Sequence, residues 1–337
     1  MHNFLFNFSS SYSGGGLKRL EEFSKWFSLH GGATFLISKK SAFLVDKYPA
    51  NNYIIPEISK IGRLLNTESY LNNFEKRKFD IYYSYGIPIT KKVANINIIH
   101  ISNVLPFIKN DFGYNIIENF KFLLLKFYFI NSLKKADVLS AESEFSISLF
   151  ENNFNKKKIV SKNGSDEEIE YFENNKHKIA KKEYENYAVV LGTHKHKAIL
   201  DSYKLFNSIK EEQNLDKLII IGSKDHLPDE ILNDNSVDLL GVMERSDVMK
   251  LLSKAKIYIS TTKVENSFNA ASEGIFLTKK SYISAIPPHF ELLKGLNFNI
   301  KKFDSIGLNI MEVNSVDIDT RNLLKWDAII EQILKLK

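Results

Sequence analysis

The sequence predicts an α/β protein with two parallel sheets, each covered by helices. Short apolar runs alternate with longer segments of helical periodicity along both halves of the chain, an order that is typical of parallel sheets. The chain has 337 residues, and two domains are expected at about 150 residues per domain. Together these observations predict two Rossmann-like domains in tandem.

The first half opens with a strand at Asn3–Phe8, a Ser/Gly loop, and a helix over Leu17–His30 with apolar residues at helical spacing. The N-terminal residues have neither a basic stretch nor a small-residue cleavage site, which favours a strand over a signal peptide. The other expected elements are strands at Thr34–Ser38, Ile81–Ser84, Ile96–His100 and Ala136–Ala141, and helices over Glu118–Lys134 and Ser143–Asn152.

The second half repeats this rhythm. Strands are expected at Tyr187–Leu191, Lys217–Gly222, Val237–Leu240, Ile257–Ser260 and Ser281–Ile286, and helices over Ala198–Glu212, Arg245–Ser253 and Asn269–Phe276. Between the halves, residues 166–182 are charged and show little periodicity. This stretch predicts an exposed linker.

The composition excludes several classes of protein. Basic residues exceed acidic ones by 46 to 40, a net charge of +6, which is below what a dedicated nucleic-acid binder usually carries. Hydrophobic residues make up 44% of the chain, as in ordinary globular proteins. The absence of cysteine excludes disulfide frameworks, zinc–thiolate sites and cysteine nucleophiles, and it favours a reducing compartment.

The longest apolar run, Phe122–Ile130, is interrupted by Lys126 and flanked by further lysines. It is about half the ~20 residues that a membrane-spanning helix needs. One interpretation is an amphipathic helix on an anionic membrane face. The other, which we favour from the sequence, is a core helix, because buried helices show the same periodicity.

Three loops that follow strands carry the candidate functional residues. The first is Gly14-Gly15-Gly16, where backbone N–H groups at the start of a helix favour an anion; a loop without a ligand is the alternative. Its spacing matches neither a dinucleotide fingerprint nor a P-loop. The second is Gly192–Lys197, a basic turn before a helix that suits a diphosphate; a solvated basic turn is the alternative. Its two histidines lack a third metal ligand, so a metal site is disfavoured.

The third loop belongs to the segment Ser260–Gly274, which contains Glu265 and Glu273 with seven residues between them. A carboxylate can accept two hydroxyl groups at once, so paired glutamates suit sugars and ribose. Two unrelated surface glutamates are the alternative. Glu273 is expected in the second turn of its helix, facing the strand ends.

This spacing resembles the E-x7-E motif of retaining glycosyltransferases with the GT-B fold, in particular group 1 (family 4). Other segments resemble the family in the same order along the chain. They are Ala136–Ser143, Ile159–Gly164, Gly192–Lys197, Leu218–Gly222, Leu240–Met249 and Trp326-Asp327. Each is weak alone, but together they cover most of the chain.

The resemblance implies a GT-B fold, in which two Rossmann-like domains face a central cleft and a C-terminal helix crosses back to the first domain. It places an acceptor-binding domain at residues 1–165 and a nucleotide-sugar-binding domain at 166–320, which begins with the 166–182 linker. Residues 321–337 form the crossing helix.

The resemblance also implies roles for individual residues. Glu273 would hold the ribose of the donor nucleotide, and Lys197 would neutralise its diphosphate. The residues that would surround the donor are Glu265, Asn266, Ser267 and Phe268 at the sugar, Gly192 and Thr193 at the phosphates, Gly15 and Gly16 along the cleft, and His100 near the sugar. His100 as a plain polar strand end is equally supported. The chain departs from the family at Thr193, where many members have arginine, and at Asn266-Ser267-Phe268, where they have Gly-Phe-Gly.

The implied activity is that of a retaining hexosyltransferase that moves a sugar to a lipid-linked or glycan acceptor in bacterial surface polysaccharide synthesis, such as O-antigen or capsule. The donor is a nucleotide sugar, with UDP expected ahead of GDP, and no cofactor or metal is implied. Asp317-Ile-Asp319 is interpreted as a cap or loop. A cytoplasmic location, with contact at the inner membrane face, is expected. The alternatives are a nucleotide-sugar 2-epimerase of the same fold and a non-catalytic partner subunit.

Overall fold

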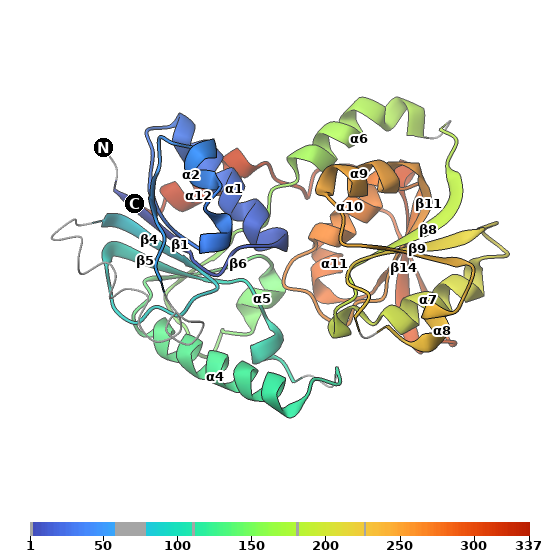
Figure 1. The fold of residues 1–337 in the computed structure, drawn as a ribbon, viewed down its shortest axis with the longest axis horizontal. Coiled ribbons are helices and arrows are strands. Elements are labelled where there is room, and N and C mark those ends of the chain that lie inside the picture. The colour runs from blue at the N-terminus through green and yellow to red at the C-terminus, as the bar shows by residue number, and fades with distance from the viewer. Residues whose placement is uncertain (1–2, 58–78, 110–111, 180–181, 226) are drawn as a thin grey trace. The chain divides into compact units, whose positions relative to one another are not determined.

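The computed structural model describes residues 3–57, 79–109, 112–179, 182–225 and 227–337. The chain divides into two compact units (Figure 1). Unit 1 comprises Met1–Gly164 and Leu324–Lys337, and unit 2 comprises Ser165–Leu323. The first segment of unit 1 ends one residue before the domain boundary expected at 165. Unit 2 ends three residues after the boundary expected at 320. The functions assigned to the two domains stay predictions.

Unit 1 contains a seven-stranded sheet with the order β3-β2-β1-β4-β5-β6-β7. Every neighbouring pair is parallel. The strands are β1 (Phe4–Phe8), β2 (Thr34–Ile37), β3 (Asn52–Ile54), β4 (Phe79–Tyr85), β5 (Ala94–Ile101), β6 (Val138–Ala141) and β7 (Lys157–Val160). The strand order reverses between β1 and β4, the position where open α/β sheets place ligands.

The helices in the described part of unit 1 are α1 (Gly14–Leu29), α2 (Leu44–Lys47), α4 (Ile116–Leu133), α5 (Glu144–Ser148) and α12 (Trp326–Leu334). Phenylalanines from β1, β2 and α1 form much of the core, together with Trp326, Ile329, Ile330 and Ile333 of α12. A Cβ on Gly164 would overlap the ring of Trp326. The chain therefore leaves unit 1 through a glycine that fits closely against the first residue of α12.

Helix α1 begins at Gly14 and not at Leu17, so the expected start of this helix is wrong by one turn. Ser13 precedes it in an extended conformation, and the first helical hydrogen bond runs from Leu17 N to Ser13 O. The first turn of a helix has no intrahelical partners for its N–H groups. The glycines therefore form this turn and not a loop before it.

Unit 2 contains the second sheet, with the order β10-β9-β8-β11-β12-β14-β13. Its strands are β8 (Glu185–Leu191), β9 (Lys217–Ile221), β10 (Val237–Gly241), β11 (Ala255–Ser260), β12 (Lys280–Ser284), β13 (Asn299–Phe303) and β14 (Leu308–Asn314). The sheet is parallel except at one edge, where β14 pairs antiparallel with both β12 and β13. Only a short turn joins β13 to β14, and a short turn connects antiparallel neighbours.

The helices of unit 2 are α6 (Asp166–Ile179), α7 (Ile199–Ile209), α8 (Asp229–Leu232), α9 (Arg245–Lys254), α10 (Asn269–Leu277) and α11 (Pro287–Leu292). The linker expected at 166–182 is wrong, because most of it is α6; residues 180–181 lie outside the described part. Ile169 and Phe172 of α6 are buried in the core, where the Phe172 ring packs on Phe276 of α10. Charged residues between these apolar positions hide the helical pattern in the sequence.

Candidate functional site

In unit 2 the strand order reverses between β8 and β11. Two loops follow these strands at their carboxyl ends, residues 192–198 after β8 and residues 261–268 after β11. Loops at such a reversal point form the ligand crevice of open α/β sheets. Eight of the eleven residues that the sequence singled out lie in these loops or in α10.

The two loops are joined by hydrogen bonds. The Thr261 hydroxyl donates to the carbonyl of Ala198 at 2.9 Å, and Lys263 N donates to the carbonyl of His196 at the same distance. Ala198 has a left-handed backbone (φ +49°) and directly precedes α7. The basic turn and the glutamate loop therefore form one connected structure.

Lys197 and Glu265 meet across this junction, where their side chains form an ion pair. Gly192 has a φ of +83°, and the position of a Cβ there would lie 3.6 Å from the stem of Lys197. Glycine thus permits the left-handed backbone of the turn, and the Lys197 side chain lies in van der Waals contact beside it. The cation predicted for the phosphates and the carboxylate predicted for the sugar lie side by side.

Thr193 has a role in holding the loop. Its hydroxyl donates to the carbonyl of Ser223, just after β9, at 2.7 Å. Thr193 therefore adds no cation to the loop, at the position where the resemblance implies an arginine. His196 does not replace it, because burial lowers the pKa of His196 to about 4 and the ring is neutral at pH 7.

Asn266, Ser267 and Phe268 connect Glu265 to α10. The Phe268 side chain is buried in the core of unit 2, while Asn266 and Ser267 are half-buried. Phe268 can therefore contribute only its backbone to a ligand. Its carbonyl accepts the first hydrogen bond of α10, from Ser272 N at 2.7 Å.

Glu273 lies in the second turn of α10 and is 8% exposed. Its carboxylate forms an ion pair with Arg245, the first residue of α9. Arg245 also contacts Glu167 at 2.6 Å and Glu168 at 3.1 Å, both in α6. The sequence analysis missed Arg245 as a site residue, although it stands at a helix start in a segment that resembles the family.

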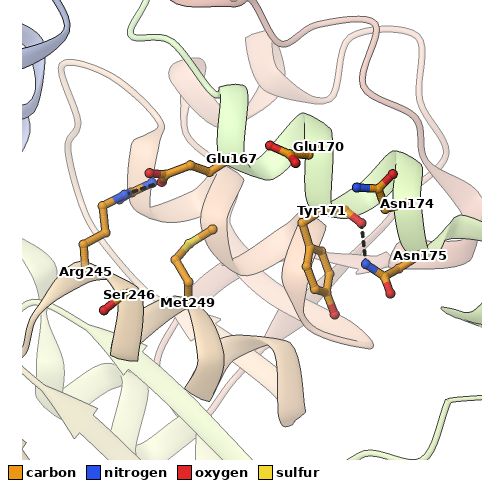
Figure 2. Close-up of a pocket in the computed structure, with 8 residues that line it drawn as sticks. All are labelled: Glu167, Glu170, Tyr171, Asn174, Asn175, Arg245, Ser246 and Met249. Carbon is orange, nitrogen blue, oxygen red and sulfur yellow. Dashed lines mark hydrogen bonds and ion pairs between the residues drawn. The ribbon is translucent and has the colours of Figure 1, made fainter. Parts of the chain in front are cut away.

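Arg245 also borders a pocket of about 470 Å³ between α6 and α9 (Figure 2). The lining residues are Glu167, Glu170, Tyr171, Asn174 and Asn175 of α6, with Arg245, Ser246 and Met249 of α9. At one end Figure 2 shows the pair of Arg245 and Glu167, and at the other Asn175 donates to the Tyr171 carbonyl at 2.8 Å. The pocket and Glu273 therefore share the Arg245 side chain.

The other three candidates, His100, Gly15 and Gly16, lie in unit 1 near the carboxyl ends of β5 and β1. Gly16 packs closely, because a Cβ there would lie 3.3 Å from Ser11 and from the Tyr85 ring. His100 pairs in register with Tyr85 of β4 and Ser140 of β6. These three side chains therefore form a row across the sheet.

His100 is fully buried, and its Nδ1 lies 2.8 Å from the Ser140 hydroxyl. Its Nε2 lies 3.6 Å from Glu142, which also accepts a 2.8 Å hydrogen bond from the Tyr85 hydroxyl. Burial, reinforced by the nearby charge of Arg19, lowers the pKa of His100 to about 4. His100 is thus a neutral imidazole held within a polar cluster, and its role at a donor sugar stays a prediction.

Two members of this part of unit 1 were missed by the sequence analysis. Glu142 directly follows β6, so its place at a strand end was a usable signal. Arg19 is fully buried in α1 and donates to the carbonyls of Ser161 and Lys162. The sequence could have indicated the burial of Arg19, because Arg19 stands four residues before Phe23. This spacing places both side chains on the same, buried face of the helix.

Within the described ranges, no group of three or more His, Asp or Glu side chains could hold a metal ion. Asp317 ends a short 3₁₀ turn, and Asp319 accepts a hydrogen bond from Arg321 N at 3.0 Å. Asp317 thus lies in a turn and Asp319 in a loop, and neither caps α12, whose N-cap residue is Lys325. In the same ranges, none of the helices has the length and apolar character needed to cross a membrane.

No protein-family model and no curated protein sequence matches this chain. Solved structures do match. HepE from Anabaena, in complex with UDP and glucose, aligns with a TM-score of 0.66 and 14% identity over 100% of this chain and 99% of HepE. Sucrose-phosphate synthase from Thermosynechococcus elongatus aligns with a TM-score of 0.66 and 10% identity, covering 100% and 98%. WaaG, a glycosyltransferase involved in lipopolysaccharide biosynthesis, aligns with a TM-score of 0.57 and 12% identity, covering 85% and 82%.

At these identities the similarity concerns the fold. Both sheets are predominantly parallel and flanked by helices, and the matches to HepE and to the synthase extend over the whole chain. The expected fold class is therefore confirmed: the chain has the two-domain α/β architecture of the GT-B fold.

Proposed function

We propose that this protein is a retaining glycosyltransferase that transfers a hexose from a nucleotide sugar to a lipid-linked or glycan acceptor. The observation that carries the proposal is the arrangement at the reversal point of unit 2. There, Glu265 is paired with Lys197 and Glu273 with Arg245. Paired carboxylates beside two cations suit a ligand that combines hydroxyl groups with phosphates.

In this proposal Glu273 accepts hydrogen bonds from the ribose hydroxyls while Arg245 holds its orientation. A carboxylate has about four acceptor positions, so a bound arginine leaves room for hydroxyl groups. Glu265 and the backbone of residues 266–268 hold the sugar. Lys197 and the N–H groups at the start of α10 stabilise the negative charge that develops on the leaving diphosphate.

The pairing of both glutamates with cations favours a binding role over a nucleophilic one. Retaining glycosidases use one carboxylate as the nucleophile, whereas attack from the face of the departing diphosphate needs no covalent intermediate. We propose the latter, without a metal ion and with UDP as the preferred nucleotide. Synthesis of bacterial surface polysaccharide in the cytoplasm, at the inner face of the membrane, is the proposed setting.

The test measures turnover of the purified protein with UDP-, GDP- and dTDP-sugars, and donor binding by calorimetry. Loss of charge-assisted hydrogen bonds, worth about 1.5–3 kcal/mol each, predicts at least ~10-fold weaker donor binding for Glu273→Ala. The matched control is Glu312→Ala. Glu312 lies in β14 and is the half-buried partner of Lys280 in β12, and its loss is expected to leave donor binding unchanged.

Unchanged turnover in a folded Glu273→Ala variant would contradict the site. Failure of the wild type to bind either UDP or GDP would instead favour a non-catalytic partner subunit. Release of an altered free sugar without any acceptor would favour the epimerase alternative.

A further inference from the structure

Helix α4 carries a concentration of exposed apolar side chains. Among the residues that the structure describes, eighteen large apolar side chains are exposed, and six of these belong to α4. They are Ile116, Ile117, Phe120, Leu123, Leu124 and Phe127, with exposed fractions from 36% to 88%. Three of the six, Leu123, Leu124 and Phe127, belong to the run Phe122–Ile130, so the sequence-based preference for a core helix is wrong for these residues.

The exposed residues form a continuous row. Ile116, Phe120, Leu123 and Phe127 follow one another at intervals of four, three and four residues, which aligns them along one side of a helix. The opposite side contains the buried Phe129, Ser132 and Leu133. Helix α4 is thus apolar on both sides and buries only one of them. A large exposed apolar patch marks an interaction surface.

Charge defines the kind of partner. Lys121 and Lys126, both exposed, each lie about 100° around the helix from a neighbouring phenylalanine, on opposite borders of the row. Lys134 and Lys135 follow its last turn. The one acidic residue of the helix, Glu118, is bound in a capping box with Asn115. The apolar row is therefore bordered by positive charge.

We propose that this face of α4, the α4 surface, binds an anionic lipid bilayer. The helix lies parallel to the membrane, with the apolar row at the boundary between headgroups and acyl chains and the lysines directed to lipid phosphates. The row from Ile116 to Phe127 extends over only ~17 Å, so it lies on a bilayer and does not span one. The α4 surface would bring the protein to a lipid-linked acceptor, as the proposed function requires, but its test measures membrane binding alone.

The first experiment is vesicle flotation of the full chain. Wild-type protein is expected to float with phosphatidylcholine vesicles containing phosphatidylglycerol, and much less with phosphatidylcholine alone. The triple variant Phe120→Ser, Leu123→Ser, Phe127→Ser is expected to bind the anionic vesicles at least about tenfold more weakly, because it loses most of the buried apolar area. The matched control, Ile300→Ser with Val316→Ser, alters two exposed apolar residues of unit 2 and is expected to bind like the wild type.

The second experiment separates charge from apolar burial. Lys121→Gln with Lys126→Gln is expected to weaken binding to anionic vesicles about tenfold and to reduce its salt dependence. Lys301→Gln with Lys302→Gln, on the exposed strand β13, removes the same charge elsewhere and is expected to have little effect. Variants that keep the melting temperature of the wild type and bind the donor equally well in calorimetry are folded. Weaker vesicle binding by such variants is then not caused by misfolding.

Three results would overturn the proposal. One is wild-type protein that stays unbound with anionic vesicles, and another is a triple variant that floats like the wild type. The third is a dimer, detected by light scattering, that the triple variant dissociates, because the α4 surface would then bind a second copy. Loss of sugar transfer with intact flotation would count against the proposed function and leave the α4 surface supported.

Discussion

Arg245 forms ion pairs with three glutamates in the unit 2 site. Its guanidinium contacts Glu273 of α10 together with Glu167 and Glu168 of α6. Burial by itself disfavours the charged guanidinium, but the charges of the three glutamates outweigh this and raise the pKa of Arg245 above its ordinary value. Arg245 therefore stays charged and ties two helices to the start of a third.

Replacing Arg245 with glutamine is expected to reduce both stability and donor binding. Glu168 is 2% exposed and Glu273 is 8% exposed, so two largely buried carboxylates would lose their cation. We expect a loss of about 2 kcal/mol in the free energy of unfolding, measured with urea, and an increase of about tenfold in the KM for the donor.

The control for this variant is Lys250→Gln on the same helix. Lys250 pairs with Asp247 on the exposed side of α9, and exposed pairs contribute at most about 1 kcal/mol. An Arg245→Gln variant with the stability and the KM of Lys250→Gln would contradict the role assigned to Arg245.

At the scale of elements, the position of Glu273 depends on how closely α10 approaches β11. A Cβ on Gly274 would overlap the ring of Tyr258, which lies fully buried in β11. The glycine next to Glu273 therefore lets the helix backbone lie directly against an aromatic ring. This contact sets the distance between the helix and the sheet.

Gly274→Ala is expected to shift α10 away from the sheet. Overpacking of this kind costs typically 1–3 kcal/mol of stability, and a displaced Glu273 should raise the donor KM with less effect on kcat. Tyr258→Ala should provide space for the new methyl group, so a double-mutant cycle is expected to show a coupling of about 1 kcal/mol. Strictly additive effects of the two substitutions on unfolding would show that this contact does not determine the helix position.

Helices α4 and α6 show why burial is difficult to infer from periodicity. In α4 the apolar run Phe122–Ile130 suggested a core helix, yet its residues Leu123, Leu124 and Phe127 are exposed. In α6 a charged stretch suggested a linker, yet Ile169 and Phe172 are buried in the core. Periodicity describes which residues share a side of a helix. Neighbouring elements decide which side is covered.

At the scale of the whole molecule, three histidines are held neutral. Burial lowers the pKa values of His100, His196 and His289 to about 4, from an ordinary value of 6.5. The charged or titratable groups around them are Arg19 and Glu142 at His100, Glu265 and Lys197 at both His196 and His289, and also His194 at His196. In each case burial outweighs the nearby carboxylate.

These histidines predict a loss of stability in mild acid. Between pH 6.5 and 4 the unfolded chain binds protons that the folded chain does not, so the free energy of unfolding falls as the pH falls. In this pH window each histidine lowers the free energy of unfolding by up to about 1.4 kcal/mol for each unit that the pH falls. Urea unfolding at several pH values measures the slope.

His289→Gln is expected to reduce this slope by about 1 kcal/mol per pH unit. His30→Gln, at an exposed position, is the matched control and should leave the slope unchanged. Equal slopes for the two variants would contradict the assignment of His289 as a buried neutral group.

Much of the unit 2 site could be predicted from the sequence. Lys197, Glu265 and Glu273 were each expected after a strand or in the helix that follows one, and parallel strands bring their carboxyl ends to one edge of a sheet. That topology brings the two loops together, whereas the ion pair of Lys197 with Glu265 was not predicted. Arg245 was not predicted, because its partners Glu167 and Glu168 were assigned to a linker.

The sequence by itself determined the fold class, the order of most elements and the loops that carry the candidate residues. These depend on periodicity, on glycine and on strand–helix alternation, which act over a few neighbouring residues. Only the tertiary structure decided that Arg245 holds Glu273, that His100 is buried beside Glu142, and that one side of α4 is exposed. Each of these depends on residues distant in the sequence, and burial and electrostatic contact are determined by neighbours in space.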